Sequence, residues 1–131
     1  MPTQRAIELF SILIFAVIGL SLLLQPLAWA RLFSWLRREG EAGSIMYGLF
    51  CLVIGALIVS FHRVWFGLLT VLTIVGWLQV IKGLIHLLAP AVGLRLMAIA
   101  SEDRTGIYRL GGVISLALAA IIYAALLPGG I

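Results

Sequence analysis

The sequence has few charged residues: Asp, Glu, Lys and Arg together make up 11% of its 131 residues. Soluble domains carry about 25% charged residues, so this chain has too little charge to cover a surface that faces water. The shortage excludes a soluble enzyme, a disordered chain and a free nucleic-acid-binding domain. The hydrophobic share of 63% and the mean hydropathy of +1.21 indicate a membrane protein instead.

Residue patterns that carry known chemistry are also missing. Cys51 is the single cysteine and lies in an apolar run, so no intramolecular disulfide can form. The sequence contains no CxxC pair, no Glu, Asp and His set at metal-ligand spacing, no nucleophile-elbow serine and no glycine-rich phosphate loop. We therefore predict a non-enzyme with no catalytic residues, no metal site and no cofactor.

Four apolar stretches are long enough to cross a bilayer, whose hydrocarbon core of about 30 Å takes roughly 20 helical residues. They cover residues 6–24, 44–61, 65–88 and 107–127 approximately. Lipid cannot satisfy an exposed strand edge, and the stretches do not alternate, so helices are expected. We predict an all-α, polytopic membrane protein that forms a single membrane domain over residues 1–131, with four transmembrane helices.

The arginines predict the orientation of these helices. Six lie in or beside the segments that follow the first and third spans, whereas the opposite side has only Arg5 and Arg63. Because cytoplasmic segments carry the excess of basic residues, loops 25–43 and 89–106 are expected in the cytoplasm and both termini outside. The expected location is the cell (inner) membrane.

The two halves of the chain resemble each other when one is shifted by 64 residues. The shift aligns Gly19-Leu20 with Gly83-Leu84, Pro26 with Pro90, and Gly48 with Gly112. We predict a duplication, with repeat one over about 6–61 and repeat two over about 64–127. Each repeat has two spans, so the repeats insert the same way up, as two parallel two-helix repeats about an axis along the membrane normal.

The segment after the first span has its own periodicity. Apolar side chains recur at helical spacing while the arginines lie off their stripe, which predicts a short interfacial helix. The apolar stripe is formed by Trp29, Leu32, Phe33 and Leu36.

A set of motif residues resembles the small two-helix inner-membrane proteins of the YjeT-like family. The set is Gly19-Leu20, Pro26, Trp29, Arg37-Arg38, Gly48 and Gly55. The second copy keeps Gly83-Leu84, Pro90 and Gly112 but has Gly93 at the Trp position. The chain thus resembles a tandem fusion of two such units, over residues 19–61 and 83–125. Family members often have a Glu before the Gly-Leu pair, where this chain has Ile18 and Lys82. The resemblance implies a membrane location and no established activity.

Small residues form a stripe on the second span and an equivalent stripe on the fourth. Small side chains let helix backbones approach closely in lipid, so these stripes are predicted packing faces. The spans would meet each other or pack on another subunit. The stripe residues are Ser44, Gly48, Cys51 and Gly55, followed by Gly112, Ser115 and Ala119.

The third span carries a polar face, and polar residues inside a membrane are candidates for a functional site. The face could contact a quinone or a lipid headgroup, relay protons or line a pore. Alternatively, Lys82 reaches the interface with its long side chain and Gln79 bonds across helices. The candidate residues are Thr73, Gln79, Lys82 and His86. Outside this face, Glu8 is expected either to pair with Arg63 or to be an interfacial charge.

These observations favour a small non-enzymatic membrane protein, an accessory or scaffold subunit of an inner-membrane complex. An oligomeric small transporter or channel is the alternative, and a quinone-, haem- or pigment-associated subunit is the second alternative. The expected partners are the lipid bilayer and either another membrane protein or further copies of this chain. No nucleic-acid partner is expected.

Overall fold

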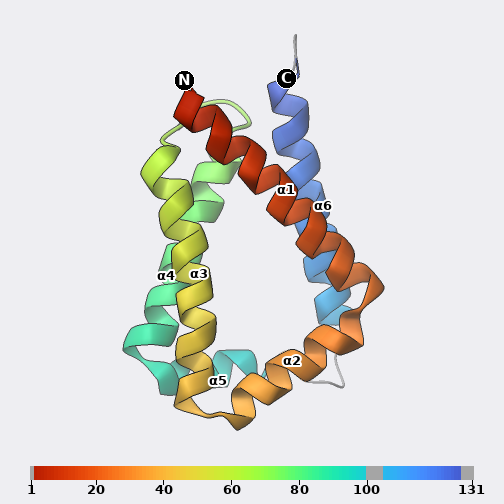
Figure 1. Ribbon diagram of the computed structural model, residues 1–131, viewed down its shortest axis with the longest axis vertical. Helices are drawn as coiled ribbons and strands as arrows, with labels where there is room; N and C mark the ends of the chain where they lie inside the picture. Colours follow the sequence, from red (N-terminus) through yellow and green to blue (C-terminus); the bar gives the residue numbers. More distant parts are fainter. Residues whose placement is uncertain (1, 100–104, 128–131) are drawn as a thin grey trace.

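The computed structural model describes residues 2–99 and 105–127, which form six helices and no strand (Figure 1). The helices are α1 (Pro2–Leu24), α2 (Pro26–Arg38), α3 (Glu41–Phe61), α4 (Thr70–Leu88), α5 (Pro90–Met97) and α6 (Thr105–Leu126). Four of them, α1, α3, α4 and α6, are long and apolar enough to cross a membrane. The prediction of an all-α, multi-pass membrane protein is confirmed.

Prolines separate the long helices from the short ones. Pro26 begins α2 and Pro90 begins α5, and proline suits the first position of a helix because its missing N–H needs no partner there. Proline also disfavours helical geometry at the preceding residue. Gln25 and Ala89 accordingly leave the helical region, with φ of −130° and −135°. The predicted helix after the first span is therefore α2, and the second linker is helical as well.

The third span is shorter than we predicted. We expected a helix over residues 65–88, but α4 begins at Thr70, and residues 66–69 form bends and turns. Gly67 adopts φ +73°, a left-handed conformation that glycine reaches without steric cost. Hydropathy could not separate this apolar turn from the helix, because Trp65 and Phe66 are as hydrophobic as the residues that follow.

The long helices pack as two pairs, α3 with α4 and α1 with α6. Figure 1 shows the pairs on either side of the molecule, with α2 and α5 across one end and the N terminus and the end of α6 at the other. The end that holds the N terminus and the end of α6 is called the terminal end below. A cluster of apolar side chains joins the pairs there, formed by Ile7, Phe15, Ile58, Leu72, Ala119 and Ile122. The two pairs are thus tied together at both ends.

Glycines bring the helices of each pair into backbone contact. A Cβ placed on Gly83 would lie 2.9 Å from the carbonyl oxygen of Gly48. In the other pair, a Cβ on Gly19 would lie 3.0 Å from the carbonyl oxygen of Gly112. The 64-residue shift maps Gly19 onto Gly83 and Gly48 onto Gly112, so it relates one contact to the other. Close approach of this kind provides van der Waals packing in lipid, where burial from water gives no driving force.

Candidate functional site

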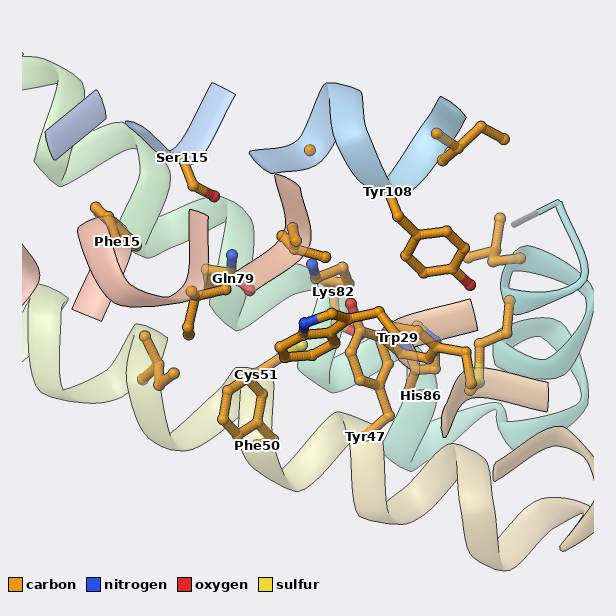
Figure 2. Close-up of a pocket in the computed structure, with 18 of the residues that line it drawn as sticks. Phe15, Trp29, Tyr47, Phe50, Cys51, Gln79, Lys82, His86, Tyr108 and Ser115 are labelled. Carbon is orange, nitrogen blue, oxygen red and sulfur yellow. The ribbon is translucent and has the colours of Figure 1, made fainter. Parts of the chain in front are cut away.

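A cavity of about 590 Å³ lies between the two helix pairs, in the half of the molecule nearer α2 and α5. Its walls come from the halves of α1, α3, α4 and α6 that are nearer α2 and α5, and residues of α2 and α5 close one end (Figure 2). The apolar cluster that joins the pairs lies on its other side, toward the terminal end. The volume is within the range of about 300–1,000 Å³ that small-molecule sites occupy.

Helix α4 contributes the polar wall of this cavity, with Gln79, Lys82 and His86. Figure 2 shows the polar ends of Gln79 and Lys82 directed into the space between the helices, with Ser115 across from Gln79. The ammonium nitrogen of Lys82 lies 5.4 Å from the centre of the Tyr47 ring, a cation–π distance. Because Tyr47 and Lys82 both line the cavity, the charge of Lys82 lies at the cavity wall.

His86 is fixed in one orientation. Its Nδ1 lies 2.9 Å from the carbonyl oxygen of Lys82, and a carbonyl can only accept, so Nδ1 carries the proton and donates it. The ring of Tyr47 meets the imidazole edge-on with centroids 5.0 Å apart. The Nε2 atom is buried and has no hydrogen-bond partner among the described residues. His86 therefore brings an unused polar atom to the cavity region.

Gly93 of α5 allows the approach of α5 to His86. A Cβ on Gly93 would lie 2.7 Å from Cδ2 of His86 and would collide with the hydroxyl oxygen of Ser44. That hydroxyl also donates a hydrogen bond of 3.3 Å to the carbonyl oxygen of His86. Gly93, which stands where the first half has Trp29, is thus required by the packing around His86.

Aromatic side chains close the cavity on the side of α2. Phe33 stacks on Tyr108 with centroids 5.7 Å apart and meets Tyr47 edge-on at 5.0 Å. Trp29 also lines the cavity, and its Nε1–H donates a 2.8 Å hydrogen bond to the hydroxyl of Ser21. We did not identify these residues as site candidates from the sequence. The only signal was that Trp29 and Phe33 lie on the apolar stripe predicted for this helix.

The wall opposite α4 is apolar and comes from α1, with Phe15, Ile18 and Leu22. The 64-residue shift maps these three residues onto the three polar residues of α4. Other lining positions are related in the same way, namely Tyr47 with Gly111, Cys51 with Ser115, and Phe33 with Met97. Six pairs of lining positions are therefore equivalent in the two halves, and the cavity has one polar and one apolar wall.

The two predicted packing stripes both face other helices of the same chain: the stripe on α3 faces α4, and the stripe on α6 faces α1. On α3, Ser44, Gly48, Cys51 and Gly55 are all buried, and Cβ atoms on the two glycines would meet α4. On α6, Gly112 and Ala119 are buried, Gly112 lies against α1, and Ser115 is half-buried in the cavity wall. We expected these stripes to meet each other or another subunit. Instead, each packs on a different helix of the same chain.

Thr73 does not share the cavity with the rest of the polar face, because it lies near the terminal end in a buried chain of hydrogen bonds. Its hydroxyl donates to the carbonyl oxygen of Val64 at 2.8 Å, so its oxygen accepts from His62 Nδ1 at 2.8 Å. His62 Nε2 lies 2.8 Å from a carboxylate oxygen of Glu8. Both side chains are almost completely buried.

This cluster gives Glu8 a role that differs from both expected ones, a pairing with Arg63 or an interfacial charge. The partners of its carboxylate are His62 and, at 3.5 Å, the Nε of Arg5, rather than Arg63, which is exposed. His62 directly follows α3 and Thr73 is in the first turn of α4, so the cluster ties α1 to the α3–α4 pair. The sequence did not indicate this role for His62, because 54 residues separate it from Glu8.

The described part of the chain brings together no three His, Cys, Asp or Glu side chains that could hold a metal ion. The segment predicted as loop 89–106 contains α5 and the first two residues of α6, and its residues 100–104 lie outside the described residues. Comparison of the chain with protein-family models, curated proteins and solved structures finds no match in any of the three.

Proposed function

We propose that the protein is a small non-enzymatic membrane protein whose central cavity binds a lipophilic molecule with a polar group. The observation that supports this most strongly is the cavity itself, which has an apolar wall from α1 and a polar wall from α4. Ligand sites are mostly apolar with a few placed polar groups, and they occur between the helices of bundles. The unpartnered Nε2 of His86 adds a buried polar atom that a ligand or water could satisfy.

The ligand is expected to come from the bilayer. The walls of the cavity are four helices whose outer faces are apolar, with Leu24, Leu88 and Leu110 at 72%, 80% and 60% exposure. Surfaces of this kind suit contact with lipid chains, and a lipophilic molecule partitions into the same environment. Partitioning raises the concentration of such a molecule next to the cavity.

Of the functions considered from the sequence, the ligand-associated membrane subunit gains support from the cavity. A ligand-binding protein of this kind can also be an accessory subunit of an inner-membrane complex, and we propose that role as well. A transporter or channel gains less, because the apolar cluster around Ile58, Leu72 and Ile122 fills the space between the pairs at the terminal end. A continuous pore would have to displace that cluster.

We further propose that α2 and α5 lie at the cytoplasmic face of the cell membrane and that both termini are outside. The basic residues Arg31, Arg37, Arg38 and Arg95 on these helices support this orientation. We also propose that the chain arose by duplication. The related glycine contacts and the related lining positions of the cavity support that origin.

Two glycines of α6 offer a test of the cavity. A Cβ on Gly111, which lines the cavity, would have only Leu22 Cδ1 nearby, at 3.9 Å, so a larger side chain can enter that space. A Cβ on Gly106 would meet nothing within 4 Å, and Gly106 is exposed outside the cavity. The assay is photolabelling of the purified protein in phosphatidylcholine nanodiscs with a diazirine-bearing palmitate, with the labelled residues mapped by mass spectrometry.

We expect the cavity residues of the native protein to be labelled. Gly111→Leu should lose most of this labelling because its side chain occupies the cavity, and Gly106→Leu should keep it. Equal cavity labelling in the two variants, or label confined to the outer faces of the helices, would contradict the proposed function.

A further inference from the structure

Lys82 adds a positive charge to the polar wall, which hydrogen bonds between helices alone would not need. We propose that it holds the anionic headgroup of a single-chain amphiphile, a fatty carboxylate drawn from the membrane. This assignment rests on the proposed function, because it names the ligand class of the same cavity. Lys82 is the only lysine of the chain, so the assignment concerns a single cationic side chain.

The charge balance of the cavity supports an anion. Lys82 is the one charged residue among the described residues that line the cavity, and no carboxylate lines it. The buried carboxylate of Glu8 bonds to His62 and Arg5 near the terminal end, so it is engaged elsewhere. Lys82 is half-buried, and a charge partly withdrawn from water is costly unless it is paired. The Tyr47 ring face supplies only part of that compensation.

The direction of the side chain supports the same conclusion. A lysine near a helix end can extend its ammonium group to the interface, and this is one role that the sequence leaves open for Lys82. The structure places the ammonium nitrogen over the Tyr47 ring, at the cavity wall. Figure 2 shows Lys82 and Gln79 reaching the same space from α4, so the amide N–H of Gln79 can donate beside the ammonium group.

The apolar wall accounts for the remainder of the ligand. From Lys82, the cavity continues along Ile18, Phe15 and Ile54, which have no polar side-chain atom. A headgroup at Lys82 would therefore leave a hydrocarbon chain against α1 and α3. One ammonium group neutralises one negative charge, which a carboxylate supplies, whereas a phosphate monoester carries about −1.5 to −2. A phospholipid diester has one charge but would bring two acyl chains into a cavity of about 590 Å³.

The test compares headgroups on one hydrocarbon chain. The native protein in phosphatidylcholine nanodiscs is photolabelled with the diazirine palmitate, and palmitate, hexadecanol, hexadecyltrimethylammonium and phosphatidylglycerol compete for the label. Lys82→Met removes the cation, Lys82→Arg keeps it, and Arg63→Met removes an exposed cation that does not line the cavity. Circular dichroism checks that each variant keeps its helices.

We expect palmitate to compete about ten- to a hundredfold better than hexadecanol, the range of a charge-assisted hydrogen bond. Lys82→Met should remove this difference, whereas Lys82→Arg and Arg63→Met should retain it. If cavity labelling persists but palmitate and hexadecanol compete equally, the assignment to Lys82 is wrong and the cavity still binds lipophilic molecules. Stronger competition by phosphatidylglycerol than by palmitate would overturn the single-chain assignment. Absence of cavity labelling in the native protein without any competitor would overturn the proposed function itself.

Discussion

The adjacent glycines Gly111 and Gly112 give the sharpest test of how the helices pack. A Cβ on Gly112 would lie 2.8 Å from the carbonyl oxygen of Gly19 and 3.0 Å from the backbone nitrogen of Leu23. Backbone atoms cannot rotate away, so Gly112→Ala must push α1 and α6 apart. Overpacking typically costs about 1–3 kcal/mol, and alanine returns up to about 1 kcal/mol of helix propensity. We expect a net loss of about 1–2 kcal/mol.

Gly111→Ala is the matched control on the same helix turn. Its Cβ would have only an ordinary contact, 3.9 Å from Leu22 Cδ1, so we expect no loss and a gain of at most about 1 kcal/mol. Unfolding by sodium dodecyl sulfate in mixed micelles, followed by circular dichroism, measures the free energy of unfolding of both variants. Equal effects of the two substitutions, or a stabilising Gly112→Ala, would refute the close approach of α1 and α6.

Two further predictions concern the buried cluster at the terminal end and the orientation in the membrane. Glu8→Leu leaves Nε2 of the buried His62 without a partner, which should cost about 1–3 kcal/mol in the same unfolding assay. Glu8→Gln should retain most of that stability because its amide can donate to Nε2, and equal losses in the two variants would contradict the arrangement. In a Cys51→Ser background, a membrane-impermeant maleimide should label Arg38→Cys from the cytoplasmic side and Phe66→Cys, which is 82% exposed in the native protein, from the outside. Labelling from the opposite sides would show that the orientation is reversed.

The sequence predicted the four long helices because their hydropathy depends on composition alone. Pro26 and Pro90 also indicated where α1 and α4 end, since proline constrains its local backbone directly. The start of α4 was wrong for a related reason. Hydropathy is the same for an apolar turn and an apolar helix, and only the positive φ of Gly67 distinguishes them.

The pairing of the helices could not be read from the sequence. A stripe of small residues, such as Gly48 on α3, is compatible with any helix that presents a similar surface, and several do. The cavity was equally hidden, because residues from different helices line it, among them Phe15 of α1, Tyr47 of α3 and Lys82 of α4. Periodicity placed Gln79, Lys82 and His86 on one face, but it could not show that Thr73 bonds elsewhere.

For Glu8, the sequence shows only formal charges, so it left two alternatives open, a pairing with Arg63 or an interfacial charge. The buried environment instead contains His62, whose two ring nitrogens bond to the carboxylate and to Thr73 at once. The resemblance to tandem YjeT-like units stays a prediction. The Gly19–Gly112 and Gly48–Gly83 contacts are related by the 64-residue shift, as a tandem duplication predicts.

We propose that the native cavity holds a lipophilic anion, and native mass spectrometry of the protein, extracted in a gentle detergent from its own membrane, can detect that molecule. We predict one retained molecule per chain with the mass of a fatty carboxylate, present in the native protein and in Gly106→Leu but lost in Gly111→Leu and Lys82→Met. A chain that retains no small molecule, or retains the same molecule in all four proteins, would contradict the claim.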